Sequence, residues 1–170
     1  MGAGPGAANE VFGDREVWAL DPAPEMLALN GADFRTVGIG EELPFADEAF
    51  DSVFSAYVFR NLDSIEQTMN QVARVLRPGG RLGVVGLGRP RGKAAASVHR
   101  VGTSVLLPAV GKLAKAPDEY MYLNESLDKL PPPEELFTAT PLRQVELWRM
   151  GAMGFVYGAV LEKEVGTNDA

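Results

Sequence analysis

The sequence predicts an α/β fold built on a mainly parallel sheet, and two observations support this. Short apolar runs typical of buried strands alternate with segments whose apolar residues recur at helical spacing. Strands and helices that alternate in this way form a parallel sheet covered on both faces. The last two predicted strands, at 143–150 and 155–162, follow each other directly and predict an antiparallel hairpin at the sheet edge.

The order of elements follows from the local patterns. Residues 16–21 (EVWALD) form an apolar run that ends in Asp21, and a helix that begins at Pro22 comes next, because proline suits a first helical turn. Ser64 and Gln67 have the spacing of a capping box, and one apolar face follows them to Leu76. Other strands are expected at 33–37, 50–56 and 81–87, a loop at 41–45, a tight turn at 77–80 and a short helix at 134–138.

Composition narrows the class of protein. The length of 170 residues suggests one domain, and the net charge of −7 argues against a nucleic-acid-binding protein. The chain has no cysteine and a single histidine, His99, which excludes thiolate and multi-histidine metal sites, so no metal is expected. No apolar run is long enough to span a membrane and no signal-peptide pattern occurs, which predicts a soluble cytoplasmic protein.

The first ten residues, MGAGPGAANE, contain three alternating glycines. Glycine lets the backbone approach a ligand closely, and in open parallel sheets ligands bind beyond the carboxyl ends of the strands. Asp21, at the end of the first predicted strand, could there accept hydrogen bonds from two ribose hydroxyls. The residues also allow a plainer interpretation, in which the glycines form a flexible terminus and Asp21 caps the next helix.

Longer phrases carry a specific resemblance. VWALDPAPEML, GEELPFADEAFDSV, FRNLDSIEQTMNQVARVLRPGGRLGVV and EYMYLNESLDKLPPPEEL, in this order, resemble the ubiquinone/menaquinone C-methyltransferases of the UbiE/MenG type. These are class I S-adenosylmethionine-dependent methyltransferases, and the resemblance covers roughly residues 2–162. It implies a Rossmann-like sheet whose last hairpin is reversed, with a methyltransferase-like domain at 1–162, a helical substrate cover at 91–130 and a flexible tail at 163–170.

The resemblance also assigns roles to residues. It implies S-adenosylmethionine as cofactor, with the glycine loop around its methionine part, Asp21 on the ribose and Met26 over the adenine. The cofactor-binding residues it implies are Gly2, Gly4, Gly6, Asp21, Pro22, Met26, Ile39 and Gly40. Arg60 and Asn61 match an Arg-Asn pair near the reacting quinol, and Tyr120 and Tyr122 match aromatics of the substrate cover. Structural interpretations stay open: Arg60 and Asn61 could tie a loop, and the two tyrosines could be core residues.

The chain departs from the family pattern in places. Family members carry Gly-Asp-Ala where this chain has Gly38-Ile39-Gly40, so a hydrogen bond from the aspartate to the adenine amino group is absent. The strand that precedes the glycine loop, and the helices before it, are also missing. Two neighbouring strands would then have unpaired backbone groups, which favours association. We therefore expect a homo-oligomer or a partner protein that completes the sheet.

Two functions remain open at this point. In the first, the chain is a methyltransferase that transfers the methyl group of S-adenosylmethionine to a ring carbon of a quinol or a similar aromatic, prenylated substrate. In the second, it is a non-catalytic subunit that binds and completes or regulates a partner methyltransferase. Basic residues between Arg89 and Lys115 form a solvated face or a peripheral contact with an anionic membrane, from which a prenylated quinone would be drawn.

Overall fold

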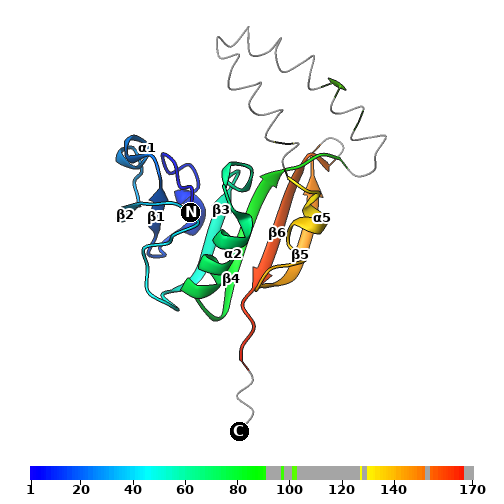
Figure 1. The fold of residues 1–170 in the computed structure, drawn as a ribbon. Helices are drawn as coiled ribbons and strands as arrows, with labels where there is room; N and C mark the ends of the chain where they lie inside the picture. The colour runs from blue at the N-terminus through cyan, green and yellow to red at the C-terminus, as the bar shows by residue number, and fades with distance from the viewer. Residues whose placement is uncertain (91–96, 98–100, 103–126, 128–129, 152–153, 167–170) are drawn as a thin grey trace.

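The computed structural model describes residues 1–90, 97, 101–102, 127, 130–151 and 154–166. Strands and helices alternate up to residue 87, and two further strands follow a short helix near the carboxyl end (Figure 1). Most of the expected substrate cover, including Tyr120 and Tyr122, lies outside the described residues, as does His99. No helix within the described ranges combines the length and the apolar composition that crossing a bilayer requires.

The described strands form two sheets. In the first, β1 (Trp18–Asp21) and β2 (Phe34–Val37) pair in parallel. The second has the order β3 (Phe50–Ala56), β4 (Leu76–Leu87), β6 (Val156–Glu162) and β5 (Arg143–Met150). There β3 and β4 are parallel, whereas β6 is antiparallel to both of its neighbours. The α/β class and the antiparallel carboxyl-terminal hairpin are therefore confirmed. The strands are divided into two sheets between β1 and β3 (Figure 1).

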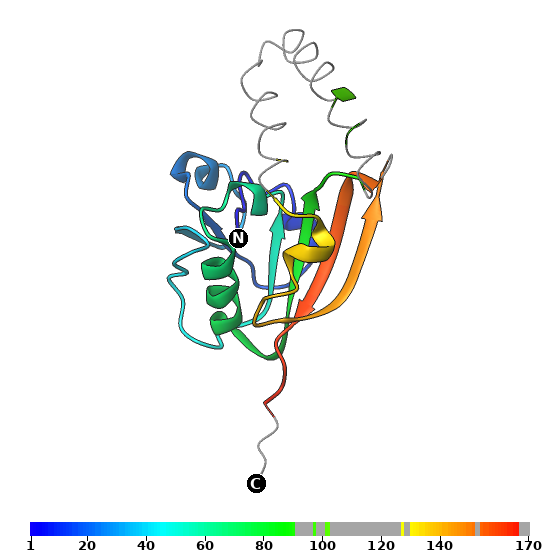
Figure 2. The ribbon, with the colours of Figure 1, turned by 45° about the vertical axis from the view of Figure 1, so that its right-hand side comes forward.

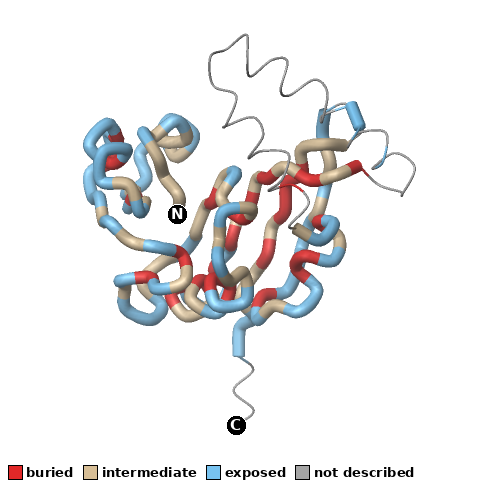
Figure 3. The backbone as a smooth tube through the Cα atoms, turned by 45° about the horizontal axis from the view of Figure 1, so that its top comes forward, coloured by how far each residue is buried: buried red, intermediate tan, exposed pale blue. Residues whose placement is uncertain are grey.

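The main hydrophobic core lies on one face of the second sheet. Helix α2 (Ile65–Val75) buries Met69, Val72 and Val75 against Leu82 and Val84 of β4. The short helix α5 (Pro133–Leu136) adds Leu136 to the same cluster (Figure 2). From Leu82 onward fully buried positions of β4 alternate with half-buried ones (Figure 3), and α2 and α5 both contribute to the core cluster on the buried face.

A smaller lobe is built around the first sheet. Helix α1 (Pro24–Ala28) buries Leu27 against Ala19 of β1 in a cluster of its own. A 3-10 helix, η1 (Asn9–Phe12), brings Phe12 edge-on to Phe54 of β3, with ring centroids 5.6 Å apart. Aromatic rings also join the two sheets at the amino ends of their strands: Trp18 contacts Phe45, and Phe45 contacts Phe50, at centroid distances of 5.9 and 4.9 Å.

The amino end of α2 confirms half of the predicted capping box. Ser64 Oγ accepts a hydrogen bond of 3.1 Å from the Gln67 amide, as expected for an N-cap serine. The reciprocal bond to the Ser64 amide is made by Glu41 Oε1, at 3.2 Å. Glu41 belongs to the loop after β2, so this contact fastens that loop to the helix.

Strand β4 begins earlier than predicted. Residues 77–80, predicted as a tight turn, lie inside β4, because Leu76 already pairs with Phe50 across an irregular register. Lys163 holds this region from the other side: its backbone exchanges hydrogen bonds with Gly79 and Gly80, and its Nζ donates to the Leu76 carbonyl at 2.8 Å. The ordered structure thus extends to Lys163, the first residue of the expected tail, of which 167–170 lie outside the described residues.

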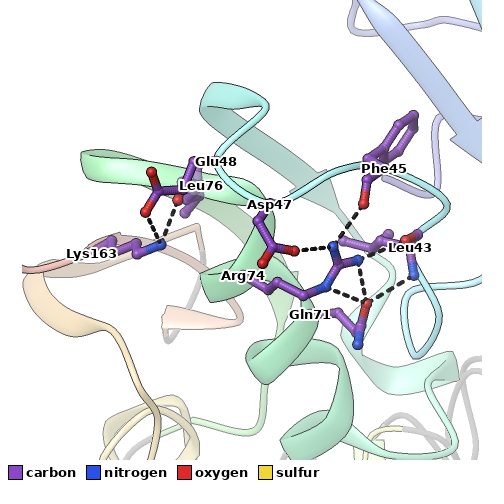
Figure 4. Close-up of polar contacts among 8 residues, drawn as sticks. All are labelled: Leu43, Phe45, Asp47, Glu48, Gln71, Arg74, Leu76 and Lys163. Carbon is purple, nitrogen blue, oxygen red and sulfur yellow. Dashed lines mark hydrogen bonds and ion pairs between the residues drawn. The ribbon is translucent and has the colours of Figure 1, made fainter.

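Arg74, the first residue of the phrase RVLRPGG, holds a loop in place through several hydrogen bonds. Arg74, on α2, donates to the carbonyls of Leu43 and Phe45 at 2.8 and 2.7 Å and to Asp47 Oδ1 at 2.8 Å (Figure 4). It also bonds to Gln71, which in turn accepts from the Leu43 amide at 3.3 Å. The loop between β2 and β3 is thereby held against α2.

Candidate functional site

The candidate site is a cleft of about 360 Å³ at the carboxyl ends of β1, β2 and β3. This is the position at which open parallel sheets bind ligands, and the volume is within the usual range for small-molecule sites. Its walls come from the amino terminus, the ends of three strands and the 3-10 turn η2 (Phe59–Asn61). The lining residues that the argument uses are Gly2, Asp21, Ile39, Gly40, Tyr57 and Asn61.

Asp21 is held in place by two backbone amides. Its Oδ2 accepts a hydrogen bond of 2.8 Å from the Gly4 amide, and its Oδ1 accepts one of 3.0 Å from the Ala23 amide. The bond to Ala23 is a turn contact two residues along the chain, and the N-cap of α1 is Ala23 rather than Asp21. A carboxylate has about four acceptor positions, so Asp21 keeps capacity for hydroxyl donors in the cleft.

The glycine loop forms part of the cleft wall and packs closely against its neighbours. Gly2 has a φ of 61°, and a β-carbon there would overlap the Val58 side chain. Met1 and Ala3 attach the loop to the two sheets: the Met1 amine donates to the Phe54 carbonyl and the Ala3 amide to the Leu20 carbonyl, both at 2.9 Å. The first glycines are therefore part of the folded site, and the interpretation as a flexible terminus is wrong.

The loop after β2 forms a second wall. Gly40 lies against Met1 and Thr68, where a β-carbon would approach Met1 Sδ to 2.9 Å. Ile39 lines the cleft with about half of its surface exposed and offers an apolar face to a ligand. Glu41, which also lines the cleft, accepts through Oε1 from the Asp63 and Ser64 amides at 2.9 and 3.2 Å, so this carboxylate ties the loop to the residues before α2.

Tyr57 is a lining residue that sequence reasoning missed. It follows β3 with a φ of 63°, a left-handed conformation that is costly for a bulky residue, and its amide donates to the Val85 carbonyl at 2.7 Å. Such backbone strain occurs preferentially at functional sites. The ring is about half exposed at the cleft. A tyrosine after a predicted strand gives no signal of a left-handed backbone, so no motif could have found it.

The expected residues divide into two groups. Gly2, Asp21, Pro22, Ile39, Gly40 and Asn61 line the cleft. Gly4 reaches it through Asp21, whereas Gly6 (φ 91°) lies against Asn30, whose side chain donates to the Gly4 carbonyl at 2.9 Å. Met26 is partly exposed and does not line the cleft, nor does Arg60, which precedes Asn61 in η2. Tyr120 and Tyr122 lie outside the described residues.

Several solved structures share this fold. The YcgJ protein from Bacillus subtilis superposes with a TM-score of 0.65 at 16% identity over 97% of this chain and 90% of that one. A structure described as SAM-dependent methyltransferases, from Methanosarcina mazei, gives a TM-score of 0.64 at 13% identity over 97% and 91%. At such identities the likeness shows the fold.

Curated relatives are more similar in sequence. The demethylmenaquinone methyltransferase of Corynebacterium urealyticum is 32% identical over 80% of this chain and 61% of its own length. The enzyme of the same name from Thermus thermophilus is 38% identical over 71% and 59%. The ubiquinone/menaquinone biosynthesis C-methyltransferase UbiE of Klebsiella pneumoniae is 34% identical over 71% and 52%. The chain thus spans between about half and three fifths of the length of these relatives.

The model of the ubiE/COQ5 methyltransferase family matches residues 30–152, which include the loop after β2, η2, α2 and β5. This range covers well over half of the chain. The matched loop and η2 contribute Ile39, Gly40 and Asn61 to the cleft. The resemblance in the quoted phrases, the fold and the family model therefore agree, and the chain belongs to the ubiE/COQ5 methyltransferase family.

Proposed function

We propose that this chain binds S-adenosylmethionine in the cleft at the ends of β1, β2 and β3 and directs its methyl group to a ring carbon of a quinol or similar aromatic substrate. The observation that carries the proposal is Asp21, which lies at the end of β1, lines the cleft and is oriented by two backbone amides. The family and the names of the curated relatives support both the cofactor and the quinone-type substrate.

The residues of the cleft fit this cofactor. Asp21 offers carboxylate oxygens to the ribose hydroxyls, and Ile39 offers an apolar side chain to the adenine. Gly2 and Gly40 line the cleft with backbone only, since a β-carbon at either position would collide with a neighbouring side chain. Ile39 cannot accept a hydrogen bond from the adenine amino group, so the adenine would be held mainly by apolar contact.

The methyl transfer requires positioning of the two reactants more than acid–base catalysis. When bound, S-adenosylmethionine would supply an electrophilic methyl group on a sulfonium; its sulfur–carbon bond would break as the bond to the ring carbon formed, and the ring proton would pass to solvent. A quinol ring is electron-rich, so alignment of the two reactants supplies much of the acceleration. Asn61 lines the cleft, whereas Arg60, the residue before it in η2, does not, so a role for Arg60 beside the phenolate oxygen of the substrate rests on the family resemblance.

The test is binding of S-adenosylhomocysteine measured by calorimetry on the purified chain. Saturable binding is expected, and Asp21→Ala should weaken it by about 1.5–3 kcal/mol because buried hydrogen bonds to a charged group are lost. Asp14→Ala, an exposed residue outside the cleft, is the matched control and should leave the affinity unchanged. Absence of binding at millimolar ligand would contradict a stand-alone enzyme.

The second candidate is a non-catalytic subunit that completes or regulates a partner methyltransferase. It is favoured by the division of the sheet among the described residues, in which β1 and β3 belong to separate sheets. A neighbour from Haloferax volcanii (TM-score 0.62) was solved as a complex of a putative methyltransferase with the Trm112 methyltransferase activator. Binding of cofactor without methyl transfer, together with a gain of activity in a second methyltransferase on mixing, would favour this candidate.

Three expectations about the surroundings of the chain remain proposals. A cytoplasmic location is consistent with the absence of a membrane-crossing helix among the described residues, and we keep it as a prediction. The peripheral membrane contact rests on basic residues of which only Arg89 is described. A homo-oligomer is testable by light scattering, in which a stable monomer would argue against it.

A further inference from the structure

Asn30 is a buried polar residue that lies outside the candidate cleft but contacts the glycine loop that forms part of its wall. It follows α1, and only 2% of its surface is exposed. It does not line the cleft that contains Asp21. Asparagine is mostly exposed in folded proteins, and a buried polar side chain needs hydrogen-bond partners. The partners of Asn30 therefore show what its burial achieves.

The side-chain amide of Asn30 uses its full hydrogen-bonding capacity. Its Nδ2 donates to the Gly4 carbonyl at 2.9 Å and to the Ala3 carbonyl at 3.5 Å. Its Oδ1 accepts from the Ala32 amide and from Asn9 Nδ2, both at 2.9 Å. A buried amide whose two donors and two acceptor positions are all satisfied is fixed in its orientation. Asn30 therefore joins the glycine loop to η1 and to the segment before β2.

Gly6 makes room for this amide. A β-carbon at Gly6 would lie 3.1 Å from Asn30 Cγ and Oδ1 and 2.8 Å from Asn9 Nδ2. Gly6 also has a φ of 91°, a conformation that glycine adopts without steric cost. Its amide donates to the Ala3 carbonyl at 3.1 Å, so the loop folds back on itself beside Asn30. Gly6 thus accommodates Asn30, whereas Gly2 lines the cleft.

Gly4 connects the Asn30 amide to Asp21. The Gly4 carbonyl accepts from Asn30, and the Gly4 amide donates to Asp21 Oδ2 at 2.8 Å. Nothing lies within 4 Å of the β-carbon position of Gly4, so hydrogen bonds rather than packing hold its backbone there. Glycine is conformationally permissive. If its carbonyl loses the donor, the peptide planes of Gly4 can turn, and its amide then leaves the Asp21 carboxylate.

We propose that Asn30 is a positioning residue of the candidate cofactor site: its side-chain amide fixes Gly4, and Gly4 in turn orients the Asp21 carboxylate toward the ribose hydroxyls. The inference rests on the proposed function, because it requires that Asp21 binds the ribose. Asn30 itself does not touch the ligand. A residue that is merely structural would alter stability, whereas a positioning residue alters affinity only while the Asp21 carboxylate is present.

Asn30→Asp isolates the link to Gly4. The new carboxylate keeps an acceptor for Ala32 and Asn9 but cannot donate to the Gly4 carbonyl, which it repels. The Gly4 amide should therefore exchange with solvent at least about tenfold faster, as measured by NMR without ligand. Arg35→Ala is the matched control, because Arg35 Nη1 donates to the main-chain carbonyl of Asn30, at 3.2 Å, and not to its side chain. This control should leave the exchange of Gly4 unchanged.

Calorimetry with S-adenosylhomocysteine tests the connection to Asp21. Asn30→Asp should weaken binding about tenfold, as expected when one hydrogen bond to a charged group is lost. In an Asp21→Ala background the same change should alter the affinity by less than about twofold, since the carboxylate that Asn30 positions is gone. Arg35→Ala should bind as the unaltered chain does.

The outcomes separate this inference from the proposed function. Absence of binding to the unaltered chain would contradict the proposed function and the inference with it. Binding that Asn30→Asp leaves unchanged, or an equal loss with and without the Asp21 carboxylate, would overturn the inference alone. If Asn30→Asp does not fold, Gly6→Ala displaces the same amide from its other side and should reproduce both effects; normal exchange of Gly4 and normal affinity in that variant would also overturn the inference.

Discussion

The α-carbon of Gly2 lies directly against the side chain of Val58, with no space for a β-carbon between them. This contact joins the glycine loop to the segment after β3, and both residues line the candidate cleft. Gly4, two residues further on, has a similar left-handed backbone but nothing within 4 Å of its β-carbon position. Alanine substitutions at Gly2 and Gly4 can therefore separate the effect of a steric collision from the effect of backbone conformation.

We predict that Gly2→Ala lowers the free energy of unfolding more than Gly4→Ala does. Both changes force alanine into a left-handed conformation, at about 1–2 kcal/mol, but only Gly2→Ala adds overpacking against Val58, at about 1–3 kcal/mol. Urea unfolding monitored by circular dichroism measures the difference. Val58→Ala in the Gly2→Ala background should recover part of the loss, and equal effects of the two single variants would contradict a collision.

Glu41 should stabilise the loop wall of the cleft through its two amide contacts. Glu41→Ala is expected to lower the free energy of unfolding by about 1 kcal/mol, because the Asp63 and Ser64 amides at the start of α2 lose their acceptor. It should also weaken S-adenosylhomocysteine binding by letting the loop move. Glu41→Gln keeps the accepting oxygen and should resemble the unaltered chain. Glu42→Ala, an exposed neighbour, is the matched control for the loss of a charge.

Local patterns predicted the elements best where the fold depends on local contacts. Strands 50–56 and 143–150 agree with β3 and β5 at both ends, and Ser64 caps α2 as expected. The second half of the capping box was wrong because Glu41, 23 residues before Ser64, takes the place of Gln67. A partner that distant in sequence carries no local signal. The same reason applies to the extension of β4 back to Leu76, which depends on its pairing with Phe50.

The candidate site was predictable only in part. Asp21 and Gly2 were found because strand ends and glycine loops have recognisable patterns, and both line the cleft. Met26 was assigned by resemblance, yet its position in α1 leaves it outside the cleft. Tyr57 was missed because its positive φ has no signature in the residues around it.

Arg74 should contribute more to stability than its visible ion pair suggests. Its partner Asp47 is largely exposed, and exposed ion pairs contribute at most about 1 kcal/mol, so Asp47→Ala should have a small effect. Arg74→Ala instead leaves the Leu43 and Phe45 carbonyls without their donor and should lower the free energy of unfolding by about 2–3 kcal/mol.

Arg74→Lys offers a sharper comparison, because lysine keeps the charge but cannot reach both carbonyls and Asp47 with one planar group. In a urea titration, Arg74→Lys should therefore lose most of the free energy of unfolding that Arg74→Ala loses. If Arg74→Lys behaved like the unaltered chain, the charge of Arg74 rather than its geometry would be the stabilising feature.

Glu162 makes the stability of the fold depend on pH, and one variant can isolate its contribution. Its carboxylate accepts from Arg81 Nε on β4 and from Arg143 Nη2 on β5, both at 2.8 Å. The hydrogen bond from Arg81, followed by that from Arg143, lowers the pKa of Glu162 below its usual value of 4.5. A carboxyl group with a lowered pKa stabilises the folded state above its unfolded pKa, and this contribution is lost as the pH falls through the folded value.

We therefore predict that the unaltered chain unfolds at a higher temperature than Glu162→Gln above pH 5, and that the two midpoints converge as the pH falls below 4. Thermal scans from neutral pH to pH 3 measure the difference between the two unfolding midpoints. The titration of the other carboxyl groups cancels in this difference, because both proteins share them. Glu164→Gln, one residue beyond Lys163 and exposed, is the matched control and should not change the midpoint at any pH. High salt should narrow the gap at neutral pH, since the pairs lie near the surface. A gap that stays constant down to pH 3 would mean that Glu162 acts through its shape rather than its charge.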